Sequence, residues 1–148
     1  MEKTQTPVVG SVVLLLLAAA AGTVFLRAGK SDAEFCRTVL NGLAQGKPSV
    51  TKRIDWDRLQ ALQVDVGATY RKLPNDGERA KYRAAFIANF ANGFHRSGAS
   101  VDAFRRWRVQ ERTADRIVIA VDYEAKRKTL LMTIPSSGRK KLESLQWQ

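Results

Sequence analysis

Residues 75–98 read NDGERAKYRAAFIANFANGFHRSG and hold the clearest helical pattern outside the apolar N-terminal run. Asn75 and Glu78 match a helix-capping pair. Aromatic side chains then recur every fourth residue, at Tyr82, Phe86, Phe90 and Phe94. Because residues four apart share one face of a helix, the pattern predicts a long helix that ends near Ser97-Gly98. A stripe of this kind is more often core than ligand wall, so we expect this helix to form the spine of the core.

The period of the apolar pattern changes from 3.6 to 2 after residue 98. Alternating residues and short linkers predict four strands. Their expected ranges are Phe104–Arg112, Ile117–Glu124, Thr129–Ile134 and Lys141–Trp147. Linkers of hairpin size favour an antiparallel meander. Helices followed by strands indicate the α+β class.

Towards the N-terminus, Ser31 and Glu34 match a capping box that opens a helix. Apolar residues follow the helical period at Phe35, Cys36, Val39, Leu40 and Leu43. The single cysteine is therefore expected to be structural, and Gly46-Lys47-Pro48 should end the helix. A second short helix is predicted from Asp55, with Trp56, Leu59 and Leu62 on one face. Residues 63–73 are weakly patterned and are either irregular or one more helical piece.

An uncharged run of nineteen residues, Val8–Leu26, precedes these elements. As a helix it measures about 28 Å, close to the ~30 Å hydrocarbon core of a bilayer. A cleaved signal peptide is the alternative, but apolar residues continue past the small residues Ala18–Ala21. We therefore expect an uncleaved single-pass anchor. The chain then divides into a tail (1–7), a transmembrane helix (8–26), a linker (27–30) and a domain (31–148).

The residues flanking this run give opposing indications of which side the domain faces. Lys3 is the one basic side chain before it, whereas Arg27, Lys30 and Arg37 follow, so the positive-inside rule favours a cytoplasmic domain. A tail of seven residues before an apolar run is instead typical of export signals. We expect a bacterial inner-membrane protein whose domain is periplasmic.

The domain is strongly basic. Residues 31–148 hold 22 Lys and Arg against 13 Asp and Glu, a net charge of +9. Beside a bilayer, each such residue near the surface attracts anionic headgroups by about 1 kcal/mol. The charge would also attract nucleic acid. The basic residues are spread in short clusters that imply no groove, so nucleic acid is not among the partners we expect.

Three motifs occur in order along the domain: Ile54-Asp55-Trp56, then Val66-Gly67 followed by Tyr70-Arg71, and then the spaced aromatics Tyr82, Phe86 and Phe90. Together with the order of elements, they resemble the cystatin-like roll of the nuclear transport factor two superfamily. Within it, the chain is similar to the periplasmic phospholipid carrier of the Mla lipid-transport system over about Ile54 to Trp147. The layout also resembles the inner-membrane scaffold subunit of type IV secretion systems. This superfamily hosts carriers, scaffolds and enzymes, so the resemblance implies a fold rather than a function.

Residues that could carry catalysis are few. His95 is the single histidine and has no ligand-spaced partner, and Asp122 fits a solvent-facing strand position better than a general base. We therefore expect no catalytic residue, no metal site and no cofactor.

A binding site is expected where the concave face of the sheet meets the aromatic helix. The candidate lining is Phe86, Phe90, Phe94, Trp107, Ile119, Tyr123, Met132 and Trp147. If these side chains leave space, the pocket takes a phospholipid or fatty-acid chain; if they fill it, the domain works through its surface.

The leading interpretation is a non-enzymatic, membrane-anchored interaction or accessory subunit of an envelope complex, with a protein partner. The alternative is a lipid-binding or lipid-transfer protein, and the third is a small enzyme of the same fold. A homodimer through the open face of the sheet is compatible with each of them.

Overall fold

The computed structural model of the chain describes residues 29–148. They form an α+β fold with a six-stranded mixed sheet, which confirms the predicted class. The expected tail (1–7), the membrane segment (8–26) and the first linker residues lie outside the described residues. No helix within residues 29–148 is both long and apolar enough to cross a bilayer.

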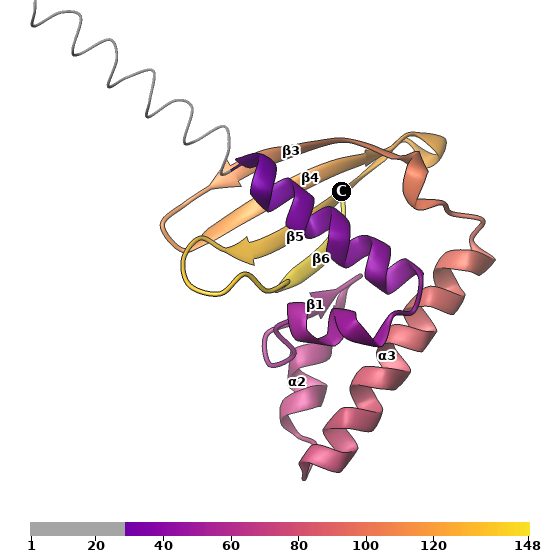
Figure 1. Cartoon of the computed structure of the whole chain (residues 1–148), viewed down its shortest axis with the longest axis vertical. Helices are drawn as coiled ribbons and strands as arrows, with labels where there is room; N and C mark the ends of the chain where they lie inside the picture. Colours follow the sequence, from indigo (N-terminus) through magenta and orange to yellow (C-terminus); the bar gives the residue numbers. More distant parts are fainter. Residues whose placement is uncertain (1–28) are drawn as a thin grey trace, which may run out of the picture.

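The N-terminal helix, residues 29–44, crosses one face of the sheet (Figure 1). Four of its apolar side chains are at most 1% exposed: Cys36, Val39, Leu40 and Leu43. The helix ends as predicted, because Gly46 adopts a φ of +63°, a conformation that favours glycine. The predicted start is wrong. The helix is already formed at residues 29 and 30, and Ser31 Oγ accepts a hydrogen bond from Lys140 Nζ at 3.0 Å.

Four strands form the predicted antiparallel meander in the C-terminal part of the chain. Their bounds are β3 Phe104–Arg112, β4 Arg116–Tyr123, β5 Lys128–Pro135 and β6 Ser144–Trp147. Short turns join β3 to β4 and β4 to β5, and the second contains the 3-10 turn η3 (Glu124–Lys126). The hairpin-sized linkers therefore set the strand order as the sequence indicated.

Two short strands extend this sheet, β1 Gln60–Ala61 and β2 Val64–Asp65, so that the order is β2-β1-β6-β5-β4-β3. The helix predicted from Asp55 is wrong. This segment instead runs parallel to the chain around Leu142, whose backbone oxygen accepts a hydrogen bond from Asp55 N at 2.9 Å. The backbone groups of the segment find partners more than eighty residues away, and this pairing outweighs the local helical pattern.

Two helices extend away from the sheet, α2 Val66–Arg71 and α3 Asp76–Arg96, after the 3-10 helix η1 Pro48–Arg53 (Figure 1). Asn75 Oδ1 accepts a hydrogen bond from Glu78 N at 2.9 Å, which is the predicted cap of α3. The helix ends at Ser97, also as predicted.

The core lies between the N-terminal helix and the facing side of the sheet. Strand side chains at most 2% exposed are Ile119, Ala120, Val121, Leu130, Met132, Ile134 and Leu145. From α3, Ile87 and Ala91 are buried, and the aromatic stripe packs against the edge of this core. The prediction that α3 is the spine of the core is therefore wrong, because the N-terminal helix occupies that place.

Candidate functional site

The aromatic stripe of α3 is half-buried. Neighbouring ring centroids lie 6.4 Å apart, both from Phe86 to Phe90 and from Phe90 to Phe94. A step of four residues turns about 40° further round a helix of 3.6 residues per turn, so Tyr82 and Phe94 differ by about 120° in direction. A stripe that winds in this way cannot lie wholly against one surface. Part of it packs on the core, and part stays accessible.

The turn between β1 and β2 brings more apolar side chains to the stripe. Leu62 and Gln63 have φ values of +49° and +71°. Two positive φ values in a two-residue turn match the type I′ hairpin turn, which prefers Asn-Gly. Gln63 N donates to Gln146 Oε1 at 2.8 Å and so fastens the turn to β6. Leu62 is thus held in a strained backbone conformation with its side chain 41% exposed.

An apolar groove results. Within residues 29–148, the large hydrophobic side chains left exposed are Leu62, Val64 at 58% and Trp147 at 40%. They border two adjoining hollows of about 360 and 390 Å³, which share Leu62, Asn89 and Phe90 in their walls. We call the two hollows together the apolar groove; its main walls are Phe86, Phe90, Phe94, Leu62, Val64 and Trp147. A continuous apolar hollow of this kind marks a binding surface more than a single exposed side chain does.

The structure does not bring the eight predicted pocket residues together. Four of them line the apolar groove: Phe86, Phe90, Phe94 and Trp147. Ile119 and Met132 are 0% exposed and Tyr123 is 5% exposed, all within the core. Trp107 lies elsewhere, against the start of the N-terminal helix. The part of the expected pocket around Ile119, Met132 and Tyr123 is therefore filled, and the hollow lies between α3 and the sheet, where the core side chains Leu130 and Leu145 also line it.

Two groove residues, Leu62 and Val64, were not predicted as site residues. The pattern assigned Leu62 to the apolar face of a helix beginning at Asp55. Leu-Gln is not a turn-forming pair, so no local signal marks the hairpin that displays both side chains. Their exposure depends on the pairing of β1 with β6, a contact between distant parts of the chain.

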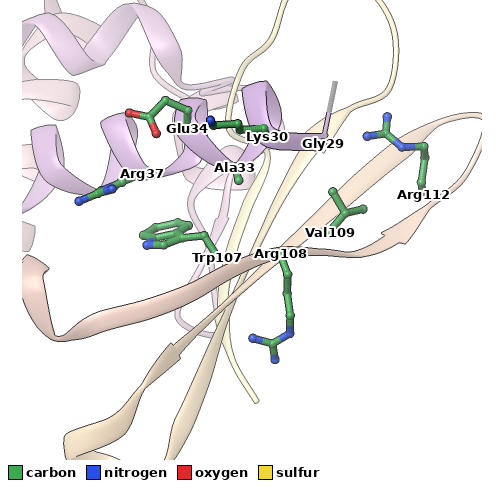
Figure 2. A pocket seen from close by; sticks show the side chains of 9 residues that line it. All are labelled: Gly29, Lys30, Ala33, Glu34, Arg37, Trp107, Arg108, Val109 and Arg112. Atoms are coloured by element: carbon green, nitrogen blue, oxygen red, sulfur yellow. The ribbon is translucent and has the colours of Figure 1, made fainter. Parts of the chain in front are cut away.

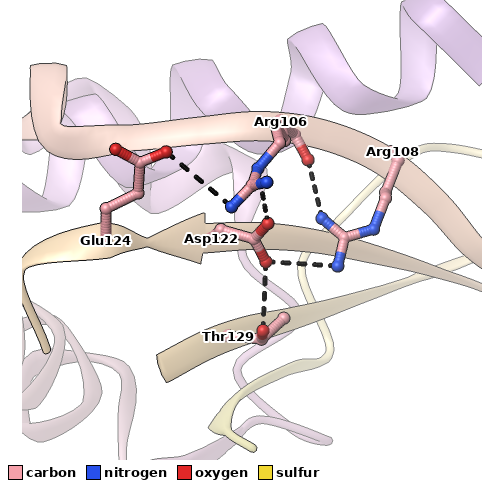
Figure 3. A network of polar contacts seen from close by, with 5 residues as sticks. All are labelled: Arg106, Arg108, Asp122, Glu124 and Thr129. Carbon is pink, nitrogen blue, oxygen red and sulfur yellow. Dashed lines mark hydrogen bonds and ion pairs between the residues drawn. The ribbon is translucent and has the colours of Figure 1, made fainter. Parts of the chain in front are cut away.

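Asp122 lies on the sheet face opposite the core within a polar network (Figure 3). Its carboxylate contacts Arg106 Nε at 2.9 Å and Arg108 Nη2 at 3.2 Å. Thr129 Oγ1 donates to it at 3.1 Å. The hydrogen bond from Arg108, helped by that from Thr129, holds the pKa of Asp122 below its usual range. A carboxylate with a lowered pKa and two arginine partners is a weak base, which fits a structural role.

Within the part of the chain that the structure describes, no group of three or more His, Cys, Asp or Glu side chains is arranged to hold a metal ion. His95 is exposed near the end of α3, with its ring centroid 6.3 Å from that of Phe94. It borders a polar hollow beside Asp102 and Arg37 rather than the apolar groove.

Comparison of the chain with protein-family models, curated proteins and solved structures found no match. The likeness to the cystatin-like roll stays a prediction.

Proposed function

We propose that this chain is a non-enzymatic, membrane-anchored interaction module of an envelope complex, and that its apolar groove docks an amphipathic helix from a partner protein. The observation that carries the proposal is Leu62, a strained and exposed leucine in a hairpin turn that would prefer Asn-Gly. Backbone strain of this kind persists where surrounding structure enforces it, and it concentrates at functional sites.

The dimensions of the groove fit a helix. The stripe from Tyr82 to Phe94 spans about 18 Å along α3, which is about three turns of a partner helix. Its walls are large aromatic side chains, the residue type that dominates binding energy at interfaces. Helix-in-groove docking uses anchors at this kind of spacing on the partner.

Charge favours an acidic polar face on the partner. Lys126 lies at one end of the apolar groove, and the described residues hold 23 Lys and Arg against 13 Asp and Glu, a net charge of +10. Like charges repel during encounter, so a partner with acidic residues beside its apolar ridge associates faster. The expected partner is therefore an amphipathic helix with an acidic flank.

The packing of the interior supports docking over lipid transfer. A carrier encloses most of its acyl chain, whereas the two hollows of the apolar groove open to the surface beside the exposed side chains Leu62, Val64 and Trp147. The core side chains Ile119 and Met132 are fully buried, and Tyr123 stacks on Phe104 with ring centroids 4.7 Å apart.

The test places a photo-cross-linking amino acid at Val64, in the full-length chain within its native membrane. Val64 is 58% exposed at the rim of the groove, and Ser137 in the exposed β5–β6 loop is the control position. We expect one protein adduct from Val64 and none from Ser137, with the adduct lost on Phe90→Ala. Adducts to lipid alone would support the carrier instead. An adduct of twice the chain's mass would identify a second copy of this chain as the occupant of the groove. The absence of any adduct would overturn the proposal.

A further inference from the structure

A second hollow, of about 510 Å³, lies between the first turns of the N-terminal helix and β3. Its apolar residues are Ala33, Trp107 and Val109. A Cβ added at Gly29 would lie 3.3 Å from Val109 Cγ2, so the helix lies in close contact with β3 at this residue. We call this hollow the helix-start pocket. It shares no residue with the apolar groove.

Charged side chains line the open side of the helix-start pocket. Figure 2 shows Lys30, Glu34 and Arg37 on the helix, Ala33 between the helix and β3, and Arg108 on the side of β3 that faces away from the helix. Positions 30, 34 and 37 fall on one face because they are spaced by four and three residues.

Of the four cations in this pocket, two are already paired. Arg108 contacts Asp122, and Arg112 contacts Asp32 at 2.9 Å. Lys30 and Arg37 form no ion pair with another residue of the described range 29–148, and both are exposed. Glu34 is the one carboxylate among the lining residues. The pocket therefore presents two cations over an apolar floor that includes a tryptophan.

The position of this pocket along the chain places it beside the apolar run. Gly29 follows Leu26 by three residues, which span at most about 11 Å of chain. If Val8–Leu26 crosses the bilayer, Lys30 lies within reach of the headgroups, and Arg37 lies about two helical turns further along. Tryptophan is also the side chain most typical of this interfacial layer.

We propose that the helix-start pocket binds the phosphate of an anionic phospholipid headgroup from the leaflet that the domain faces. Lys30 and Arg37 donate to the phosphate oxygens, and Trp107 and Val109 contact the glycerol and the upper acyl chain. The inference rests on the membrane anchor of the proposed function but not on the apolar groove. Near a bilayer surface, removing two such cations should weaken headgroup binding about 10- to 30-fold.

The experiment uses the full-length chain in nanodiscs of phosphatidylcholine, with and without one third of phosphatidylglycerol. Hydrogen exchange is followed in peptides that cover residues 29–37 and 105–112. We expect several-fold slower exchange with phosphatidylglycerol, and loss of this difference in Lys30→Gln/Arg37→Gln. The matched control is Lys72→Gln/Arg96→Gln, which removes the same charges from α2 and α3 surfaces away from the pocket and should leave the difference intact.

A substitution at Glu34 distinguishes a headgroup-binding site from a purely structural role of the pocket. Glu34→Gln removes a negative charge that would repel the phosphate. It should therefore increase the protection from hydrogen exchange in phosphatidylglycerol discs, an effect that altered packing alone would not produce. A chain that inserts into the discs but shows equal exchange in both lipids, or whose difference survives Lys30→Gln/Arg37→Gln, overturns the pocket and leaves the anchor standing. A chain that does not insert overturns the anchor and this inference together.

Discussion

Asp32 and Arg112 form the best-buried ion pair of the described residues, with Oδ2 of Asp32 2.9 Å from Nη2 of Arg112 and the Asp32 side chain 4% exposed. Lys140 Nζ lies 2.9 Å from the other carboxylate oxygen and also donates to Ser31. One carboxylate on the N-terminal helix thus joins the end of β3 to the loop between β5 and β6. These contacts fix the helix start against the sheet.

Substitution of Asp32 by Asn should destabilise the domain. Removing one member of a buried pair leaves its partners without a counter-charge and costs about 3–5 kcal/mol when they are fully buried. Arg112 and Lys140 side chains are 34% and 39% exposed, so water offsets part of this loss. We expect the free energy of unfolding to fall by about 2 kcal/mol. Urea denaturation measures it, with Asp57→Asn at an exposed side chain as the control; equal midpoints for the two variants would contradict the role of the pair.

Gly67 is required by close backbone packing. A Cβ at this position would lie 2.4 Å from Asp57 O, an atom of the backbone that cannot move aside. We expect Gly67→Ala to lower the free energy of unfolding by about 3 kcal/mol, the upper part of the range for overpacking. Gly93 in α3 is the matched control, because nothing lies within 4 Å of its added Cβ. Gly93→Ala should raise stability by up to about 1 kcal/mol through helix propensity.

The contrast between these two glycines shows what the sequence can predict. Gly93 lies in a helix whose cap and period are local, and that helix was predicted with its bounds. Gly67 packs against Asp57 in a segment whose path depends on pairing with residues near Leu142, and there a helix was predicted wrongly. Local periodicity determines the meander and α3, whereas a parallel pairing across more than eighty residues leaves no periodic signal.

The candidate site divides in the same way. Phe86, Phe90 and Phe94 could be predicted as site residues because their four-residue spacing places them along one face of a helix. Leu62 and Val64 could not, since their exposure follows from a strained turn without turn-forming residues. The burial of the stripe also depends on the N-terminal helix, which packs on the sheet and leaves the stripe at the edge of the core.

Cys36 should make stability depend on pH in the alkaline range. Burial raises the pKa of its thiol from 9.0 to about 12, with a smaller contribution from the Asp32 carboxylate. The unfolded chain therefore loses this proton near pH 9, while the folded chain keeps it. Between these values the folded state binds more protons, so the free energy of unfolding falls as pH rises, by up to about 1.4 kcal/mol per pH unit.

The measurement compares the wild type with Cys36→Ala by urea denaturation from about pH 8 to pH 10.5, a range that crosses the ordinary thiol pKa. The difference in stability between the two should shrink as pH rises, because the alanine variant has no thiol to titrate. In the same range the native thiol should resist labelling by a maleimide, whereas the denatured chain labels readily. A pH-independent difference together with rapid native labelling would show that the thiol is accessible.

Substitutions in the turn at Leu62-Gln63 should change stability and binding in opposite directions. Non-glycine residues in the left-handed region cost about 1–2 kcal/mol each, and Asn-Gly adopts the type I′ turn with little strain. We therefore expect Leu62→Asn/Gln63→Gly to raise the free energy of unfolding by about 1–2 kcal/mol, measured by urea denaturation. Gln63→Gly alone, which keeps the leucine, should give part of this gain.

The same double variant should lose the partner adduct from Val64, because it removes a 41% exposed apolar side chain from the shared wall of the groove. Gln63→Gly alone should retain the adduct. A variant that is more stable yet no longer docks its partner is the result expected when strain is kept for function. If Leu62→Asn/Gln63→Gly instead destabilises the domain, Leu62 contributes packing that outweighs the strain, and the turn no longer points to a binding role.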